Sequence, residues 1–176
     1  MKTTTALFLA VILAFASCDN AIEKPIEPDK PMETNAHRDS IVQFIRAYIG
    51  EIWNQSDFTN ADKYWGPEFR NVFAPGLPHG PEAMKQQVAY FLDAFDDIHF
   101  ELKDIMVDGE KVSMWIEISG VHTGEFFGIP PTGKEVKFRE AVWYTLKDGK
   151  LDEVYPFVDW NMLFEQLGRY PALGGG

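Results

Sequence analysis

Cysteine, basic residues and long apolar stretches are all scarce in this sequence, and each shortage excludes a class of protein. The 176 residues include 1 cysteine, Cys18, so no disulfide can form within the chain. Lys and Arg total 16 against 27 Asp and Glu, and a net charge of -11 leaves no basic surface for nucleic acid. The apolar stretch 6–15 is too short for a permanent transmembrane helix. One globular domain remains, for which a hydrophobic share of 45% supplies a sizeable core.

The N-terminus has the pattern of a targeting segment rather than of a fold. Lys2 precedes the apolar stretch, and small residues lead up to Cys18, so residues 1–17 are predicted to be a signal peptide. A lone cysteine at this place resembles a bacterial lipoprotein signal, in which the cysteine is acylated, although Phe15 stands where leucine is commoner. The resemblance implies an exported, membrane-anchored protein. Ordinary secretion is the alternative.

The next segment is predicted to be a tether. Residues 18–34 carry a proline at every third position among charged residues, which favours an extended spacer: Pro25, Pro28 and Pro31. A single domain is predicted over 35–170, followed by a flexible tail over 171–176.

The order of periodic segments predicts an α+β fold. Helical spacing of apolar residues comes first, and alternating strands follow. The expected helices cover 35–54, 57–65, 81–97 and 161–168, and the expected strands 68–73, 98–107, 111–126, 134–146 and 150–160. Asp108-Gly109 and Asp148-Gly149 predict two hairpins. Helices followed by such strands favour helices packed on one face of a strongly curved antiparallel sheet.

Strand alternation places three kinds of ionisable side chain on a concave face. His122 and Glu140 share the parity of apolar neighbours in their strands, and Asp159 with Glu153 ends the last strand. A carboxyl held among apolar groups has a raised pKa, which suits it to general acid–base catalysis. The simpler alternatives are that His122 bonds a loop carbonyl, that Glu140 pairs with an arginine, and that Asp159 caps the last helix.

Aromatic residues are numerous, and some of them are expected to line a cavity for a small hydrophobic molecule. Two of these belong to the stretch GEFFGIPPTGKEV at 124–136, which is predicted to be a connector between the hairpins that lies at the mouth of that cavity. The candidate ligand-binding residues are Trp53, Tyr64, Phe69, Phe126, Phe127 and Tyr155.

Three motifs together resemble one known family. They are EIWNQSDF after the first helix, SGVHTGEFFGIPPTGKEVKF around the loop, and LKDGKLDEVYPFVDWNMLFEQLG at the end. From about Asp39 to Gly168 the chain resembles the SnoaL-like polyketide cyclases, or ester cyclases, which share the fold of nuclear transport factor and ketosteroid isomerase. The resemblance implies a cone-shaped barrel enclosing a pocket, no metal and no cofactor.

The resemblance also implies a reaction. In such cyclases an acidic residue acts as acid and base in an intramolecular aldol ring closure. The positions that match family motifs are Asp159 and His122, whereas Glu140 rests on strand parity alone. The sequence departs from the family pattern in its first strand, where Asn71 stands in a region that often carries histidine.

Three functions are therefore open from the sequence. The chain is a cofactor-free acid–base lyase or isomerase, a non-catalytic binder of a small hydrophobic ligand, or an interaction module. Under each of them Trp115 and Trp143, on the outer parity of the sheet, predict a homodimer.

Overall fold

The computed structural model describes residues 35–170. The predicted signal peptide (1–17), the tether with Cys18 (18–34) and the tail (171–176) lie outside the described residues. Within the described part, no helix is long and apolar enough to cross a membrane.

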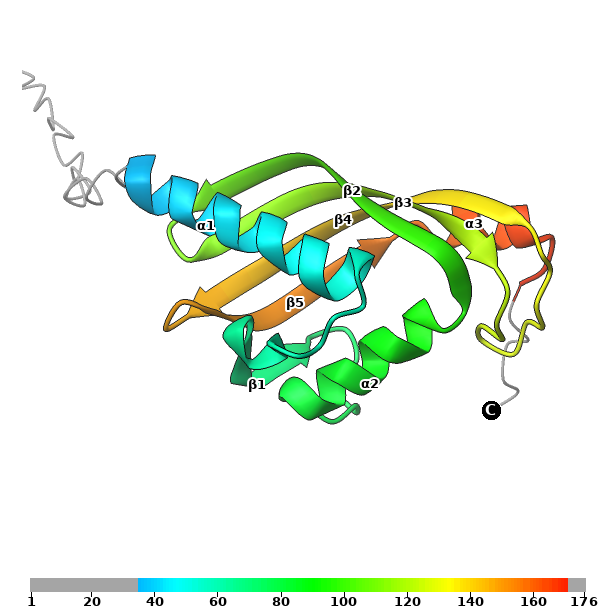
Figure 1. Ribbon diagram of the computed structural model, residues 1–176, viewed down its shortest axis with the longest axis horizontal. Helices are drawn as coiled ribbons and strands as arrows, with labels where there is room; N and C mark the ends of the chain where they lie inside the picture. The colour runs from blue at the N-terminus through cyan, green and yellow to red at the C-terminus, as the bar shows by residue number, and fades with distance from the viewer. Residues whose placement is uncertain (1–34, 171–176) are drawn as a thin grey trace, which may run out of the picture. The chain divides into compact units, whose positions relative to one another are not determined.

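Helices come first and strands follow, as the sequence predicts (Figure 1). The helical elements are α1 (Asn35–Tyr48), the π-helical turn η1 (Ile49–Asn54), the 3-10 turn η2 (Ala61–Lys63), α2 (Pro81–Leu92) and α3 (Trp160–Leu167). The strands are β1 (Trp65–Asn71), β2 (Phe95–Asp108), β3 (Lys111–His122), β4 (Glu135–Lys147) and β5 (Lys150–Val158). The α+β class is thereby confirmed.

The five strands form one open, mixed sheet in the order β1-β5-β4-β3-β2. The two predicted hairpins hold, and positive φ angles at Gly109, Asp148 and Gly149 form their tight turns. The expectation of a purely antiparallel sheet is wrong at one edge, because β1 pairs with β5 in parallel. No short turn joins these two strands, so hairpin geometry does not fix their direction.

Several predicted boundaries differ from the structure. The short helix expected over 57–65 is only the turn η2, and β1 begins at Trp65 rather than at residue 68. Helix α2 ends at Leu92 rather than at residue 97, and Asp97 takes a positive φ of 51° at an irregularity in the β2–β3 pairing. Strand β3 ends at His122, so the whole stretch 123–134 is loop.

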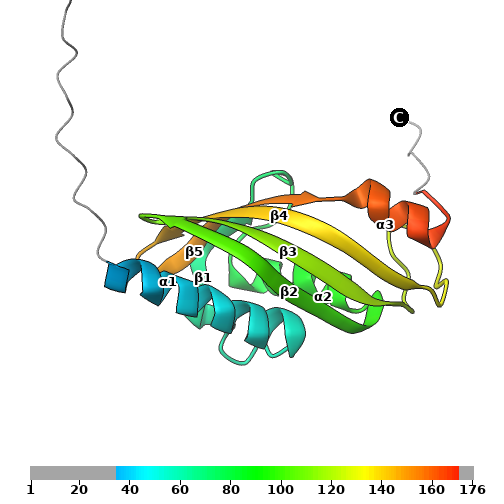
Figure 2. The same cartoon turned by 90° about the horizontal axis from the view of Figure 1, so that it is seen from above.

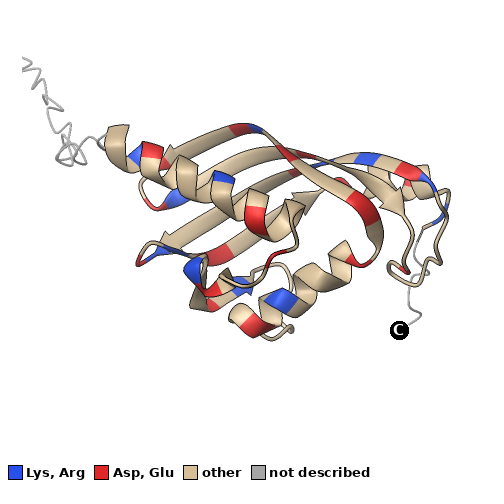
Figure 3. Ribbon diagram, in the orientation of Figure 1, with Lys and Arg blue, Asp and Glu red and all other residues tan. Residues whose placement is uncertain are grey.

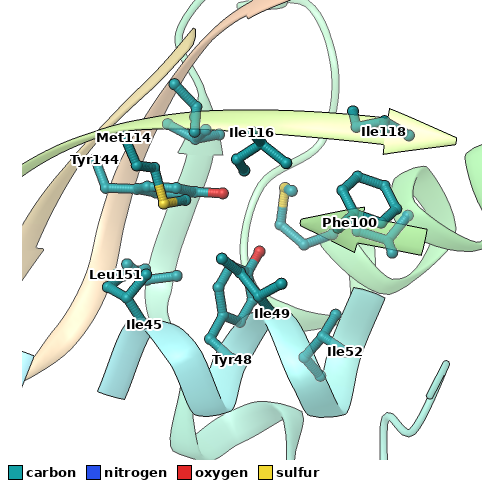
Figure 4. Close-up of a cluster of buried hydrophobic side chains, with 14 of the residues drawn as sticks. Ile45, Tyr48, Ile49, Ile52, Phe100, Met114, Ile116, Ile118, Tyr144 and Leu151 are labelled. Carbon is teal, nitrogen blue, oxygen red and sulfur yellow. The ribbon is translucent and has the colours of Figure 1, made fainter. Parts of the chain in front are cut away.

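Helices α1 and α2 lie against one face of the curved sheet and build the core there (Figure 2). The helical stripe of α1 and η1 meets the inward side chains of β3 and β4 (Figure 4). Its buried residues are Ile41, Ile45, Tyr48, Ile49 and Ile52. Helix α3 sits beyond the end of β5, where the Gln166 side chain bonds the backbone of Lys137 through both N–H and C=O at 2.8 and 2.9 Å.

The predicted faces of β3 and β4 are confirmed, and that of β5 is corrected. In β3 and β4 the buried residues alternate on the expected parity, and the half-buried Glu140 shares that parity. In β5 the pairing with β4 shifts by one residue, because Leu146 pairs with Leu151 but Thr145 pairs with Glu153. This bulge flips the side chains that follow, so Val154 is buried and Glu153 turns away from the concave face.

Charged residues are spread over all parts of the described domain, with both signs interspersed along the strands (Figure 3). Several form surface ion pairs, among them Lys103 and Lys137 with Glu117 at 3.2 and 2.7 Å. Such a surface solvates the fold and leaves the concave side apolar.

Candidate functional site

A cavity of about 520 Å³ lies between the helices and the concave face of the sheet. Most of its lining is aromatic or aliphatic, and α1, η1, α2, all five strands, the β3–β4 loop and α3 contribute side chains. The polar lining residues are Tyr48, Asn71, Gln86, Gln87, Tyr90, Glu140 and Tyr144. Among these lining residues Glu140 is the one carboxylic acid. Lys, Arg and His are absent from the described residues of the lining.

Glu140 projects into this cavity from the middle of β4, between Ile116 of β3 and Val158 of β5. No hydrogen bond or ion pair joins its carboxyl group to another residue of the described domain, and its oxygens retain accessible surface inside the cavity. Burial among apolar side chains raises the pKa of Glu140 to about 7. The arginine partner that the sequence left open as an alternative is therefore missing, and the carboxyl group can exchange protons near neutral pH.

Two tyrosines stand beside Glu140. Tyr48 of α1 and Tyr144 of β4 pack edge to face with ring centroids 6.0 Å apart, and both hydroxyl oxygens point into the same space (Figure 4). Trp65 Nε1 donates to the Tyr48 hydroxyl at 3.4 Å. Burial raises the pKa of both phenols, so both keep their protons at neutral pH.

The β3–β4 loop forms one wall of the cavity. Phe126 and Ile129 exchange backbone hydrogen bonds of 3.0 and 2.9 Å around a tight turn, which buries Phe126 and leaves Phe127 exposed. The Phe127 N–H donates to the Tyr90 hydroxyl of α2 at 2.9 Å, and the Phe127 ring meets Trp160 edge to face. The loop is thus both a connector and a cavity wall tied to α2 and α3.

His122 lies at the base of this loop and outside the cavity lining. Its Nδ1 is 3.0 Å from Thr132 Oγ1 and accepts from the Thr132 N–H at 3.3 Å, whereas Nε2 is buried without a partner in the described domain. Burial lowers the pKa of His122. The side chain is placed to hold the loop and does not reach the cavity.

Asp159 is the N-cap of α3. Its carboxylate accepts from the Met162 N–H at 3.0 Å, its side chain is exposed, and it does not line the cavity. This placement matches the capping alternative and separates Asp159 from Glu140. The structure therefore does not bring the three predicted acid–base residues together.

Four of the six predicted ligand-binding aromatics line the cavity: Trp53, Phe69, Phe126 and Phe127. Tyr64 is buried but packs between α1 and Lys63. Tyr155 lies on the outer face, stacked on Trp143 and bonded to Glu153, because the bulge in β5 reverses its direction.

Sequence reasoning missed Tyr48 and Tyr144. Both fall on predicted core faces, where an aromatic ring is normally read as packing. A usable signal existed, because Tyr144 shares a strand face with Glu140, and a phenol on such a face brings a hydroxyl toward a buried acid. Among residues 35–170 no three His, Cys, Asp or Glu gather closely enough to hold a metal ion.

Comparisons with known proteins agree on one family. The model of the SnoaL-like polyketide cyclases matches residues 43–167. The nogalonic acid methyl ester cyclase of Streptomyces nogalater is 24% identical over 66% of this chain and 89% of its own length. The aklanonic acid methyl ester cyclase of Streptomyces peucetius is 28% identical over 51% of this chain and 63% of its own length. The structure of TsrD from Streptomyces laurentii superposes with a TM-score of 0.70 at 25% identity, covering 76% of this chain and 98% of that one.

Proposed function

Since the chain belongs to the SnoaL-like polyketide cyclase family, we propose that it catalyses a cofactor-free, aldol-type ring closure of a small carbonyl compound. Glu140 is the acid–base group of this reaction. The observation that carries the proposal is a single unpaired carboxyl group, with a pKa of about 7, facing an apolar cavity of about 520 Å³.

In the proposed reaction Glu140 takes a proton from the substrate and later returns it to the product. Ionised Glu140 removes a proton from the carbon beside a carbonyl group, and the electron pair of that C–H bond becomes an enolate. The enolate carbon attacks a second carbonyl of the same molecule, which forms the C–C bond and leaves the electron pair on oxygen. Protonated Glu140 returns its proton to that oxygen, so the product is an isomer of the substrate and the carboxylate is restored.

The lining supports an uncharged substrate. Fixed positive charges are absent from the described lining, and ionised Glu140 and the net charge of -11 disfavour an anion. Aromatic side chains such as Phe69, Phe91 and Phe138 suit a planar ring system. The names of the two relatives specify methyl esters, in which the carboxyl group is uncharged. These esters are the substrates to test first.

The test compares two carboxylate replacements in the purified full chain. We expect Glu140→Gln to slow ring closure of aklanonic acid methyl ester by about 10²- to 10⁴-fold, the usual loss when a general base is removed. We expect Asp159→Asn, which keeps a capping oxygen outside the cavity, to retain wild-type turnover. For the wild type, kcat/KM should rise with pH through about 7.

Each result has a distinct meaning. If Asp159→Asn abolishes turnover while Glu140→Gln does not, the assignment of the base to Glu140 is wrong. A second outcome combines two results: neither methyl ester is turned over, and native mass spectrometry finds a small molecule bound equally by the wild type and Glu140→Gln. In that case the chain is a ligand-binding protein. That second candidate is favoured by one observation, the placement of Asp159 and His122 outside the cavity.

We propose that the domain works outside the cytoplasm, anchored through acylated Cys18 by the predicted tether. Supporting this are the signal-like segment 1–17 and the lone cysteine that follows it. Labelled palmitate should be incorporated by the wild type and not by Cys18→Ser. Labelling of both, or of neither, would contradict the anchor.

A further inference from the structure

The ionised cavity carries a negative charge that no lining residue balances. Glu140 is the one carboxylic acid of the described lining, and none of the described lining residues is Lys, Arg or His. No hydrogen bond or ion pair of the described domain reaches the carboxyl oxygens, which keep accessible surface inside the cavity. A buried carboxylate without a counter-ion is costly, and a ligand with a positive charge would supply the counter-ion.

Aromatic rings from four elements line the same cavity. The ring centroids of Trp53 of η1 and Phe100 of β2 are 4.7 Å apart, and Phe91 of α2 lies 6.3 Å from Phe138 of β4. Phe138 stands two residues before Glu140 on the same strand face, which places their Cα atoms about 7 Å apart. Since cation–π contacts reach about 6 Å from a ring centroid, a cation between these two side chains can contact both.

The kind of cation follows from the shortage of hydrogen-bond acceptors. Each N–H of a primary ammonium or guanidinium group needs an acceptor once it leaves water. Most of this lining is apolar, and Glu140 is its one carboxylate. A quaternary ammonium group has no N–H to satisfy, and aromatic cages bind it through the faces of their rings. The net charge of -11 also raises the concentration of cations near the protein.

The cavity opens to solvent between α2 and α3. Four of its lining residues are exposed and largely apolar: Leu77, Tyr90, Phe127 and Trp160. An aromatic substituent on the cation can lie against these side chains while the charged group reaches Glu140. The entrance therefore favours a cation with a hydrophobic substituent over a small one such as tetramethylammonium.

We propose that the cavity is also a binding site for hydrophobic quaternary ammonium compounds, with ionised Glu140 as the counter-ion and the rings of Phe91 and Phe138 against the charged group. This ligand class goes beyond the neutral substrate of the proposed function, and it does not depend on the aldol chemistry. The two ligands occupy the same space, so a bound cation excludes the substrate and acts as a competitive inhibitor of ring closure.

The test compares a cation with its uncharged isostere. Benzyltrimethylammonium and neopentylbenzene have the same shape, because a nitrogen in the first replaces a carbon in the second. Trp53 lines the cavity, so tryptophan fluorescence of the purified full chain reports binding of both. At pH 8, where Glu140 is mostly ionised, we expect the cation to bind about 10-fold or more tightly than the isostere, as a close charge pair in a desolvated site provides.

The pH dependence identifies the counter-ion. With a pKa of about 7, only about one tenth of Glu140 is ionised at pH 6, so the cation should bind about 10-fold more weakly there than at pH 8. The other titratable groups of the described lining are the phenols of Tyr48, Tyr90 and Tyr144, from α1, α2 and β4. Phenols are uncharged at both pH values, and the affinity for neopentylbenzene should not change.

Two variants that remove the same charge separate a site from a general attraction. Glu140→Gln should weaken cation binding about 10-fold at pH 8, abolish its pH dependence and keep the affinity for neopentylbenzene. Asp159→Asn is the matched control, because its carboxylate caps α3 outside the cavity. It should keep the wild-type affinity for both compounds. Circular dichroism melting checks that each variant is folded.

The outcomes are distinguishable from failure of the proposed chemistry. Equal affinity of the wild type for the two compounds at pH 8 overturns the cation site. An equal loss of cation binding in Glu140→Gln and Asp159→Asn also overturns it, since the attraction would then come from the net charge. Ring closure without any preference for the cation overturns the cation site alone. A Glu140-dependent preference for the cation without ring closure overturns the enzymatic function and leaves a cation-binding pocket.

Discussion

At the scale of single residues, Glu140 sets a conflict between stability and chemistry. Its pKa is raised from 4.5 to about 7 by burial, so the folded state binds a proton that the unfolded state has released between these values. Stability must therefore fall as pH rises from about 4.5 to about 7 and stay low above it. The shift corresponds to at most about 3 kcal/mol, because the carboxyl group retains some accessible surface in the cavity.

Glu140→Gln should remove this loss. We expect the variant to exceed the wild type in free energy of unfolding by up to about 3 kcal/mol at pH 8 and to approach it at pH 4.5. Urea unfolding at both pH values measures the difference. Glu153→Gln is the control of opposite sign, since Arg70 and Tyr155 lower the pKa of Glu153, and its pairing stabilises the fold only above acidic pH. If the free energy of unfolding depends on pH in the same way in the wild type and in Glu140→Gln, the raised pKa of Glu140 is contradicted.

Some residues of the candidate site could be predicted from the sequence. The wrong predictions have a physical reason. The parity of β4 identified Glu140 because strand alternation is regular there. Strand parity predicted the wrong face for Glu153 and Tyr155, because a bulge inserts one residue into β5. The residues around this bulge show no sequence pattern from which it could be predicted. For Asp159 and His122 the residue types suit both catalysis and local hydrogen bonding, and no sequence pattern separates the two roles. Both make local bonds.

At the scale of elements, the β3–β4 loop is held in place by one close approach. A Cβ on Gly124 would lie 2.3 Å from the Asp93 carbonyl oxygen and 2.8 Å from the Ala94 Cα, so the loop backbone fits against the α2–β2 connection only without a side chain. The Gly124 N–H uses this contact to donate to the Ala94 carbonyl at 3.0 Å.

Gly124→Ala should therefore destabilise the fold by about 1–3 kcal/mol, as overpacking does, and loosen the cavity wall that carries Phe126. Gly50→Ala is the matched control, because a Cβ there meets nothing within 4 Å and the position is helical. It should change stability by no more than about 1 kcal/mol, in the stabilising direction. Thermal unfolding compares the two, and equal effects would show that the close approach does not constrain the loop.

At the scale of the whole molecule, the order of elements was predictable and the edge of the sheet was not. Helical spacing, strand alternation and two Asp-Gly turns are local signals, and they predicted α1, α2, α3 and the meander of β2 to β5. The parallel pairing of β1 with β5 joins segments about 80 residues apart. Long-range pairing of this kind leaves no local pattern. The cavity also depends on long-range contacts, because its lining comes from elements along most of the described chain. Its shape therefore could not be predicted from local sequence patterns.

The outer face of the sheet carries the last prediction, a homodimer. Trp115, Trp143 and Phe157 are 42%, 39% and 56% exposed there, on three neighbouring strands. Aromatic area of this kind on the solvent side of a sheet is costly unless a partner covers it. A second copy brings an identical face, and a twofold axis over β4, the central strand, would oppose the two Trp143 side chains.

Trp143→Glu should then convert the dimer to a monomer, because two added carboxylates would oppose each other in a desolvated interface. Light scattering after gel filtration at equal concentrations measures the mass. Leu77→Glu is the control, since Leu77 is 49% exposed but lines the cavity on the other side of the sheet, and it should leave the mass unchanged. A wild-type monomer, or a dimer lost equally in both variants, would contradict this interface. Because the face lies behind the cavity, loss of the dimer should leave turnover of aklanonic acid methyl ester intact. A joint loss of the dimer and of turnover would instead indicate that the partner supports the curvature of the sheet.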